Sequence, residues 1–236
     1  MTTEPSRRHV MRTLGAALLL PAIVPTAEAA EHEEKEVEAA EDLMREHGVL
    51  RRALLVYAEA AARLTNGATD VSAGALHDTA ALFRTFGEEY HERSLEEKHV
   101  FPAVVKAGGK PAQLASILKQ QHVRGREITD YLSAVTSRGP VSPGNVKPLA
   151  GALASFVRMY EHHAAIEDTI IFPAWKAAIS DSQYEELSEQ FEDLEHKMFG
   201  KDGFEDALER IGRIEQAFGL ADLSRLTAPA PPKPAA

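Results

Sequence analysis

The chain has 236 residues, 26 Lys and Arg against 36 Asp and Glu, a formal net charge of −10 and no cysteine. The missing cysteines exclude disulfides, thiolate metal sites, iron–sulfur clusters and cysteine nucleophiles, so any metal site must use His, Asp and Glu. The acidic balance argues against nucleic-acid binding, because phosphate backbones attract positive charge.

The first thirty residues are predicted to be an export signal and not part of the fold. A short apolar stretch from Leu14 to Val24 precedes the small-residue cleavage pattern Ala27-Glu28-Ala29. The run from Ser6 to Met11 resembles a twin-arginine signal. The basic residues of this region are Arg7, Arg8 and Arg12. We therefore expect an exported protein, periplasmic or otherwise extracytoplasmic, with no stable membrane span once residues 1–30 are removed.

Helical periodicity begins after the short charged linker of residues 30–37. The first helix is expected over residues 38–65 and is stopped by Asn66-Gly67. The second is expected over residues 71–101, where Pro102 kinks or ends it.

The remaining helices follow in the same manner. The third opens near Pro111 and runs to about residue 136, and the fourth covers residues 146–172, followed by Pro173. Ser182 with Glu185 has the form of a capping box for a fifth helix, and a sixth runs to about Phe218. We predict an all-α, up-down-up-down four-helix bundle over residues 38–180. Two additional helices are expected at 181–220, and a disordered Ala/Pro-rich tail at 221–236.

One motif occurs twice. The segments 91–102 and 162–173 each contain His, then two acidic residues, then Phe-Pro. The preceding helices match more loosely, with Glu46-His47 against Gln121-His122. The bundle is therefore predicted to consist of two helical hairpins, each with one His on its first helix and a His/Glu pair on its second.

The repeated residues are expected at one depth of the bundle. With about 1.5 Å rise per residue, the four histidines lie about 14–17 Å from the same end. They are His47, His91, His122 and His163, and Glu96 and Glu167 follow less than two turns further on. Burying such groups together is costly unless cations compensate, so we predict two metal ions that share the two carboxylates.

Two ligand choices remain open at this point. His163 and Glu167 are four residues apart and share a helix face, although it is His162 that aligns with His91. His91 and Glu96 are five apart, so they reach one site only if the helix has a π-bulge, and Glu97 is the alternative.

These residues resemble the hemerythrin-like, HHE cation-binding family, over about residues 40–180. The resemblance implies a bundle with two non-haem iron ions and the ligands His47, His91, Glu96, His122, His163 and Glu167. Oxygen-carrying members have a further His one turn after the third-helix His, where this chain has Arg126, so the chain is more similar to the bacterial four-His branch.

The sequence thus favours a di-iron protein that binds or senses dioxygen or nitric oxide. The alternatives are a peroxide-reactive enzyme of the catalase or peroxidase type and an iron-handling protein. One tyrosine of the bundle helices is expected to hydrogen-bond a metal-bound ligand, from the set Tyr57, Tyr90, Tyr131 and Tyr160.

Overall fold

The structure is a computed structural model that describes residues 37–233. The expected export signal and His32 lie outside the described residues. Within the described part the chain is all-α, and no strand occurs there, which confirms the predicted fold class.

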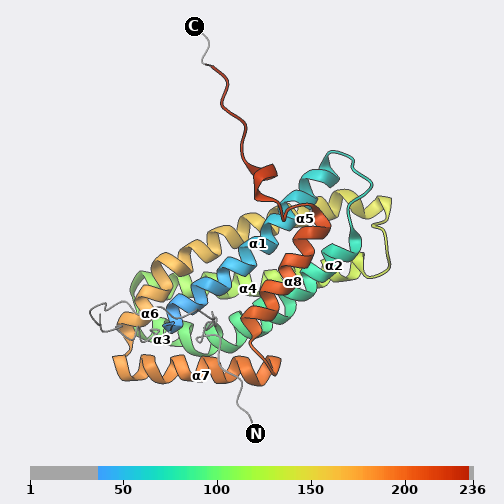
Figure 1. The fold of residues 1–236 in the computed structure, drawn as a ribbon. Helices are drawn as coiled ribbons and strands as arrows, with labels where there is room; N and C mark the ends of the chain where they lie inside the picture. The colour runs from blue at the N-terminus through green and yellow to red at the C-terminus, as the bar shows by residue number, and fades with distance from the viewer. Residues whose placement is uncertain (1–36, 234–236) are drawn as a thin grey trace, which may run out of the picture.

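Four long rods form the bundle in Figure 1. The first is α1 (Ala39–Thr65) and the third is α4 (Gly109–Thr136). The second and fourth are composite, because each changes without a break from an α-helix to a π-helix and back. The second consists of α2 (Ala73–Leu82), the π-helix η1 (Phe83–Val100) and α3 (Phe101–Ala107), and the fourth of α5 (Pro143–Ile166), the π-helix η2 (Glu167–Ile171) and α6 (Phe172–Ala178).

Two further helices cover the bundle. Helix α7 (Asp181–Phe199) crosses the end formed by α3 and α6, and α8 (Gly203–Phe218) returns along α1 and α2 (Figure 1). A short 3₁₀ helix, η3 (Leu223–Leu226), precedes the tail. Trp175 of α6 is fully buried and lies against Tyr184 and Phe191 of α7, so the crossing helix is fastened to the bundle by aromatic packing.

An aromatic core fills the bundle beyond the histidines. Phe156 contacts Tyr57, Phe83 and Tyr160, with ring centroids 5.5, 4.9 and 4.5 Å apart. These side chains are buried and closely packed, and through Tyr160 this aromatic core contacts His163.

The structure corrects two local predictions. Of the two alternatives given for Pro102, a helix end is excluded, because the second and fourth rods continue past Pro102 and Pro173, which stand in the first turn of α3 and α6, where a residue without an N–H is tolerated. The capping box of α7 is formed by Ser180 and Gln183 and not by Ser182 and Glu185, because Ile179 is extended and the helix begins two residues earlier.

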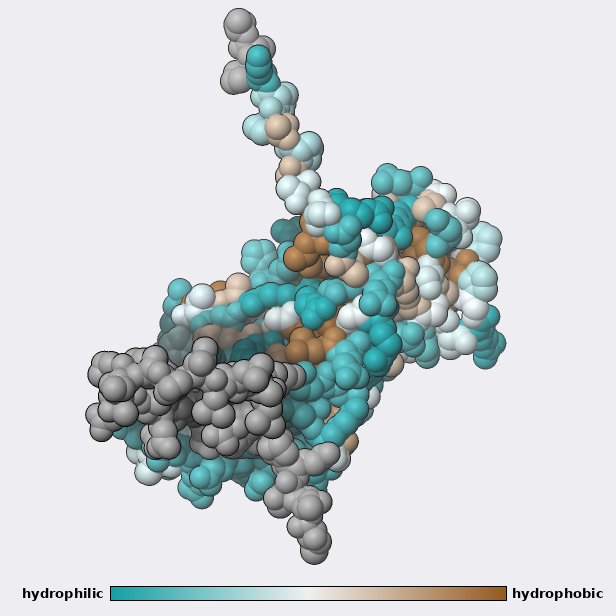
Figure 2. Space-filling model, in the orientation of Figure 1, coloured by the Kyte–Doolittle hydropathy of each residue, from teal (hydrophilic) through white to brown (hydrophobic). Residues whose placement is uncertain are grey.

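The surface in Figure 2 is mostly hydrophilic, with apolar side chains visible in a few separate places. None of the described helices combines the length and the apolar character that crossing a bilayer requires.

Candidate metal centre

The six residues singled out by the repeat lie together in the bundle, on four different rods. His47 comes from α1, His122 from α4 and His163 from α5. His91 and Glu96 come from η1 and Glu167 from η2. None of the six is more than 3% exposed. The structure thus brings the whole predicted set into one buried cluster, while its role as a ligand set remains a prediction.

The cluster has two lobes, and the first is called position A. Here Nε2 of His47 and Nε2 of His91 are 3.0 Å apart. Glu96 Oε1 lies 3.4 Å from His91 Nε2, and Glu167 Oε2 lies 3.4 Å from His47 Nε2.

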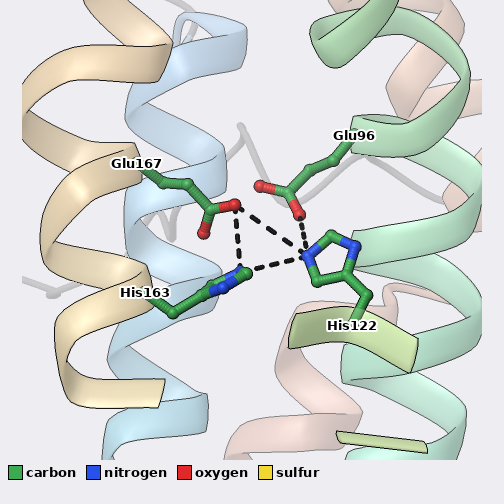
Figure 3. Close-up of side chains that lie close together, drawn as sticks. All are labelled: Glu96, His122, His163 and Glu167. Carbon is green, nitrogen blue, oxygen red and sulfur yellow. Dashed lines mark hydrogen bonds and ion pairs between the residues drawn. The ribbon is translucent and has the colours of Figure 1, made fainter. Parts of the chain in front are cut away.

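The second lobe, position B, has the same composition. Nε2 of His122 and Nε2 of His163 are 3.0 Å apart, with Glu96 Oε2 3.4 Å from His122 and Glu167 Oε1 3.0 Å from His163 (Figure 3). Glu96 and Glu167 each direct one oxygen to each lobe. They are therefore placed to bridge two ions, one in each position.

Helix geometry explains why both ligand spacings work. His163 and Glu167 are one α-helical turn apart. His91 and Glu96 lie in the π-helix η1, where hydrogen bonds join residues five apart, so this spacing also places both side chains on one face. Of the open alternatives, His162 is exposed, and Glu97 lies on the outer side of His122, where its Oε1 is 3.0 Å from Nδ1.

Each of the four imidazoles is held from behind through its Nδ1. The acceptors are Asp168 for His47 at 2.7 Å, Glu46 for His91 at 2.7 Å, Glu97 for His122 at 3.0 Å, and Gln121 for His163 at 2.9 Å. With its proton on Nδ1 and donated outward, each ring presents the lone pair of Nε2 to the centre, which is the tautomer that a metal requires.

None of these four residues was predicted from the sequence to hold a histidine, and Glu97 was considered there only as an alternative metal ligand. The signal was present in the doublets Glu46-His47, Gln121-His122, Glu96-Glu97 and Glu167-Asp168. In each doublet one residue faces the centre and its neighbour holds a histidine of another helix. Helical spacing along the sequence cannot predict these hydrogen bonds, because each one joins a histidine to an acceptor on another rod.

Two arginines complete the outer layer at equivalent places. Arg51 follows His47 by four residues and pairs with Asp168, while Arg126 follows His122 by four residues and pairs with Glu97. Burial alone would raise the pKa of Glu97, but the hydrogen bonds from His122 and Arg126 lower it to about 2. The pKa of Asp168 is lowered against burial in the same way by His47 and Arg51. Both acceptors are thus kept ionised.

The cluster fits metal ions by two criteria. All four oxygens of Glu96 and Glu167 are buried without a hydrogen-bond partner among the described residues. Within each position, two imidazole nitrogens face each other at 3.0 Å. Two nitrogens bound to one ion at right angles, each at about 2.1 Å, would be separated by about this distance. A cation in each position would be a partner for the carboxylate oxygens and for both nitrogens.

A small cavity adjoins the cluster between α1 and α5. Its volume is about 10 Å³, enough for one water-sized molecule. His47, His91 and His163 form one wall, and the others come from α1 and α5 with Glu92. The rest of the lining consists of the apolar Leu50, Leu54 and Ala164 together with Arg51, Glu92 and Tyr160.

Polar side chains from α4, α5 and η1 also meet beside the cluster. Tyr160 donates to Glu92 Oε1 at 2.5 Å, and Arg126 donates to Glu92 Oε2 at 3.0 Å. Arg126 is 2.9 Å from Glu97 as well, so its guanidinium already supplies the cation for this pair of carboxylates. Arg126 therefore does not face the centre as a fifth ligand.

The other histidines of the described chain lie elsewhere. His77 pairs with Thr136, His99 packs on Phe191, and His196 is in the last turn of α7.

Comparison with known proteins agrees with this geometry. The family model described as the hemerythrin HHE cation-binding domain matches residues 38–174 and again residues 113–222. Uncharacterized proteins of Mycobacterium bovis and of two strains of Mycobacterium tuberculosis are 43% identical to the chain over 197 residues, which is 83% of this chain and 76% of theirs. No solved structure matches.

Proposed function

The chain belongs to the hemerythrin HHE cation-binding family, and from that premise we propose that it is a non-haem di-iron protein that binds or senses dioxygen or nitric oxide. The observation that supports this most strongly is the bridging placement of Glu96 and Glu167, each with one oxygen toward two imidazoles in position A and one toward two in position B. The six side chains would hold two iron ions, and four histidines in place of five correspond to the bacterial four-His branch.

The choice of a small ligand follows from the surroundings of the cluster. Two imidazoles and two carboxylate oxygens per ion leave further coordination positions for a ligand. The cavity beside His47 and His91 has room for one water-sized molecule, and Leu50, Leu54 and Ala164 form the apolar part of its lining. A larger substrate would not fit. Iron in this centre would supply reversible ligand binding or electron transfer, while the chain sets its access and holds the imidazoles in place.

The proposal includes export. The basic and apolar pattern of residues 1–30 supports a twin-arginine-type signal. The site of action would then be extracytoplasmic.

Optical spectroscopy tests the ligand. Protein loaded with Fe(II) under argon is exposed to dioxygen or nitric oxide, and a charge-transfer band that disappears when the gas is removed is expected. The matched pair is His163→Ala, which should lose the band, and His162→Ala, which removes an exposed neighbour and should keep it. A wild-type spectrum that does not change with either gas would refute the ligand assignment.

A second candidate is reaction with peroxide. The position one turn after His122 is occupied by Arg126, which points to Glu92 and Glu97, so this helix supplies no second imidazole to position B. Oxygen evolution on addition of hydrogen peroxide, lost in His47→Ala, would favour this enzyme. Iron that leaves readily on reduction would instead favour an iron-handling role.

A further inference from the structure

The two hairpins place matching residues around the two metal positions, so the cluster has an approximate twofold arrangement. Helices α1 and η1 form the first hairpin, and α4 and α5 with η2 form the second. The matching pairs are His47 with His122, His91 with His163, Glu96 with Glu167, Glu97 with Asp168, and Arg51 with Arg126.

The two hairpins differ at the residue directly before the first histidine of each, so the twofold match fails there. In the first hairpin this residue is Glu46, whose carboxylate accepts the Nδ1 hydrogen bond of His91 at 2.7 Å. In the second it is Gln121, whose amide oxygen accepts from His163 at 2.9 Å. Position A therefore has carboxylate acceptors behind both of its imidazoles, whereas position B has one carboxylate and one neutral amide.

The difference acts directly on metal affinity. A hydrogen bond from an imidazole N–H to a carboxylate is roughly twice as strong as one to a neutral acceptor. It draws the proton away from the ring and so makes the opposite nitrogen a better electron donor to a metal. Glu46 is 0% exposed, so solvent does not screen this effect.

One additional carboxylate lies near position B, but it does not restore the balance. Glu92 Oε2 is 3.9 Å from Nδ1 of His122, beyond hydrogen-bonding distance. It is paired with Arg126 and with the Tyr160 hydroxyl and accepts no hydrogen bond from either histidine of position B, so it does not replace the carboxylate that is missing behind His163.

On the premise of the proposed function, we propose that position A binds its metal ion more tightly than position B, because Glu46 stands where the second hairpin has Gln121. The centre then fills in the order A, B and loses its metal in the reverse order. The cavity borders both histidines of position A but only His163 of position B. The tightly held ion is therefore the one that faces the ligand cavity, and the second ion is exchangeable.

The test is a titration of the metal-free full chain with Co(II) under argon. Calorimetry and the visible absorption of bound Co(II) measure the binding at each addition. Wild type is expected to bind two ions with dissociation constants at least about tenfold apart, since loss of an outer hydrogen-bond partner typically changes metal affinity 10–100-fold. Glu46→Gln should weaken the tighter site by about that factor, and Gln121→Glu should strengthen the weaker one. Glu41→Gln, an exposed acid of the same helix, is the control and should change neither.

Assignment of the sites uses one variant of each position. His122→Ala should retain the tighter constant, and His47→Ala only the weaker one. Two ions bound with equal constants that neither Glu46→Gln nor Gln121→Glu separates or shifts would overturn the inequivalence and leave the di-metal centre standing. If wild type binds no Co(II) or Fe(II), the proposed function itself fails. Gln121→Glu keeps the test decisive if Glu46→Gln does not fold.

Discussion

Gly125 of α4 lies directly against the hydroxyl of Tyr160 of α5. A Cβ on Gly125 would stand 2.2 Å from that oxygen, so no other residue fits without moving the tyrosine. The contact holds the Tyr160 hydroxyl against Glu92, at the side of the centre where Arg126 also binds. A single glycine thus permits the polar packing that closes this side of the cluster.

Replacing this glycine is expected to destabilise the protein. In Gly125→Ala, the new methyl group pushes Tyr160 away and breaks its bond to Glu92, lowering the free energy of unfolding by about 1–3 kcal/mol. Urea denaturation measures it. Gly151→Ala on α5 is the control, because a Cβ there meets nothing within 4 Å and should leave stability unchanged or raise it by up to about 1 kcal/mol. Equal effects of the two variants would contradict the packing role.

The two matching arginines are expected to differ in importance. Arg126 is 12% exposed and pairs with the buried Glu92 and the partly buried Glu97, so Arg126→Ala removes the guanidinium from both carboxylates and should cost about 3–5 kcal/mol. Arg51 is 43% exposed, so Arg51→Ala should cost only about 0–1 kcal/mol. Denaturant unfolding of both variants at pH 7 makes the comparison. An equal or larger loss in Arg51→Ala would show that burial does not set the difference.

Glu88 is expected to make stability depend on pH. Burial raises the pKa of this carboxyl from 4.5 to about 7, although the Arg84 guanidinium beside it acts in the opposite direction. Because the folded state holds the proton more tightly, stability falls as pH rises from about 4.5 to 7, by up to about 3 kcal/mol.

The isosteric variant Glu88→Gln isolates this effect. It should be more stable than wild type at pH 8 by up to about 3 kcal/mol, and nearly equal to it at pH 5. Glu89→Gln, the exposed neighbour, should show no such pH-dependent difference. If the gap between Glu88→Gln and wild type is the same at pH 5 and pH 8, the raised pKa is wrong.

Metal removal is expected to lower stability. In the metal-free cluster, the four buried carboxylate oxygens of Glu96 and Glu167 have no hydrogen-bond partner among the described residues, and a bound cation would supply one. A metal present at 1,000 times its dissociation constant contributes about 4 kcal/mol. A chelator should therefore lower the thermal midpoint of wild type, and added iron should restore it. His163→Ala should respond much less, and a wild-type midpoint indifferent to chelator and iron alike would count against the metal.

The fold was predictable because its helices are marked by helical periodicity and by Gly and Pro between them. The meeting of the six central residues followed from their repeated spacing. His91 and Glu96 share a face only because the helix there is a π-helix. The sequence spacing made a π-bulge necessary for this pair, but α-helical periodicity could not predict where the π-helix begins and ends. The roles of Glu46, Glu97, Gln121 and Asp168 depend on contacts between rods, and these form only when the bundle packs.

Metal analysis of the purified exported protein tests the central claim most directly. The six side chains of positions A and B should retain two iron ions per chain. The measurement is the molar ratio of iron, determined by mass spectrometry, to protein. His162→Ala should retain the same amount, and His163→Ala should lose at least one ion. A wild-type protein that carries no metal, and takes up none when iron is supplied, would contradict the account.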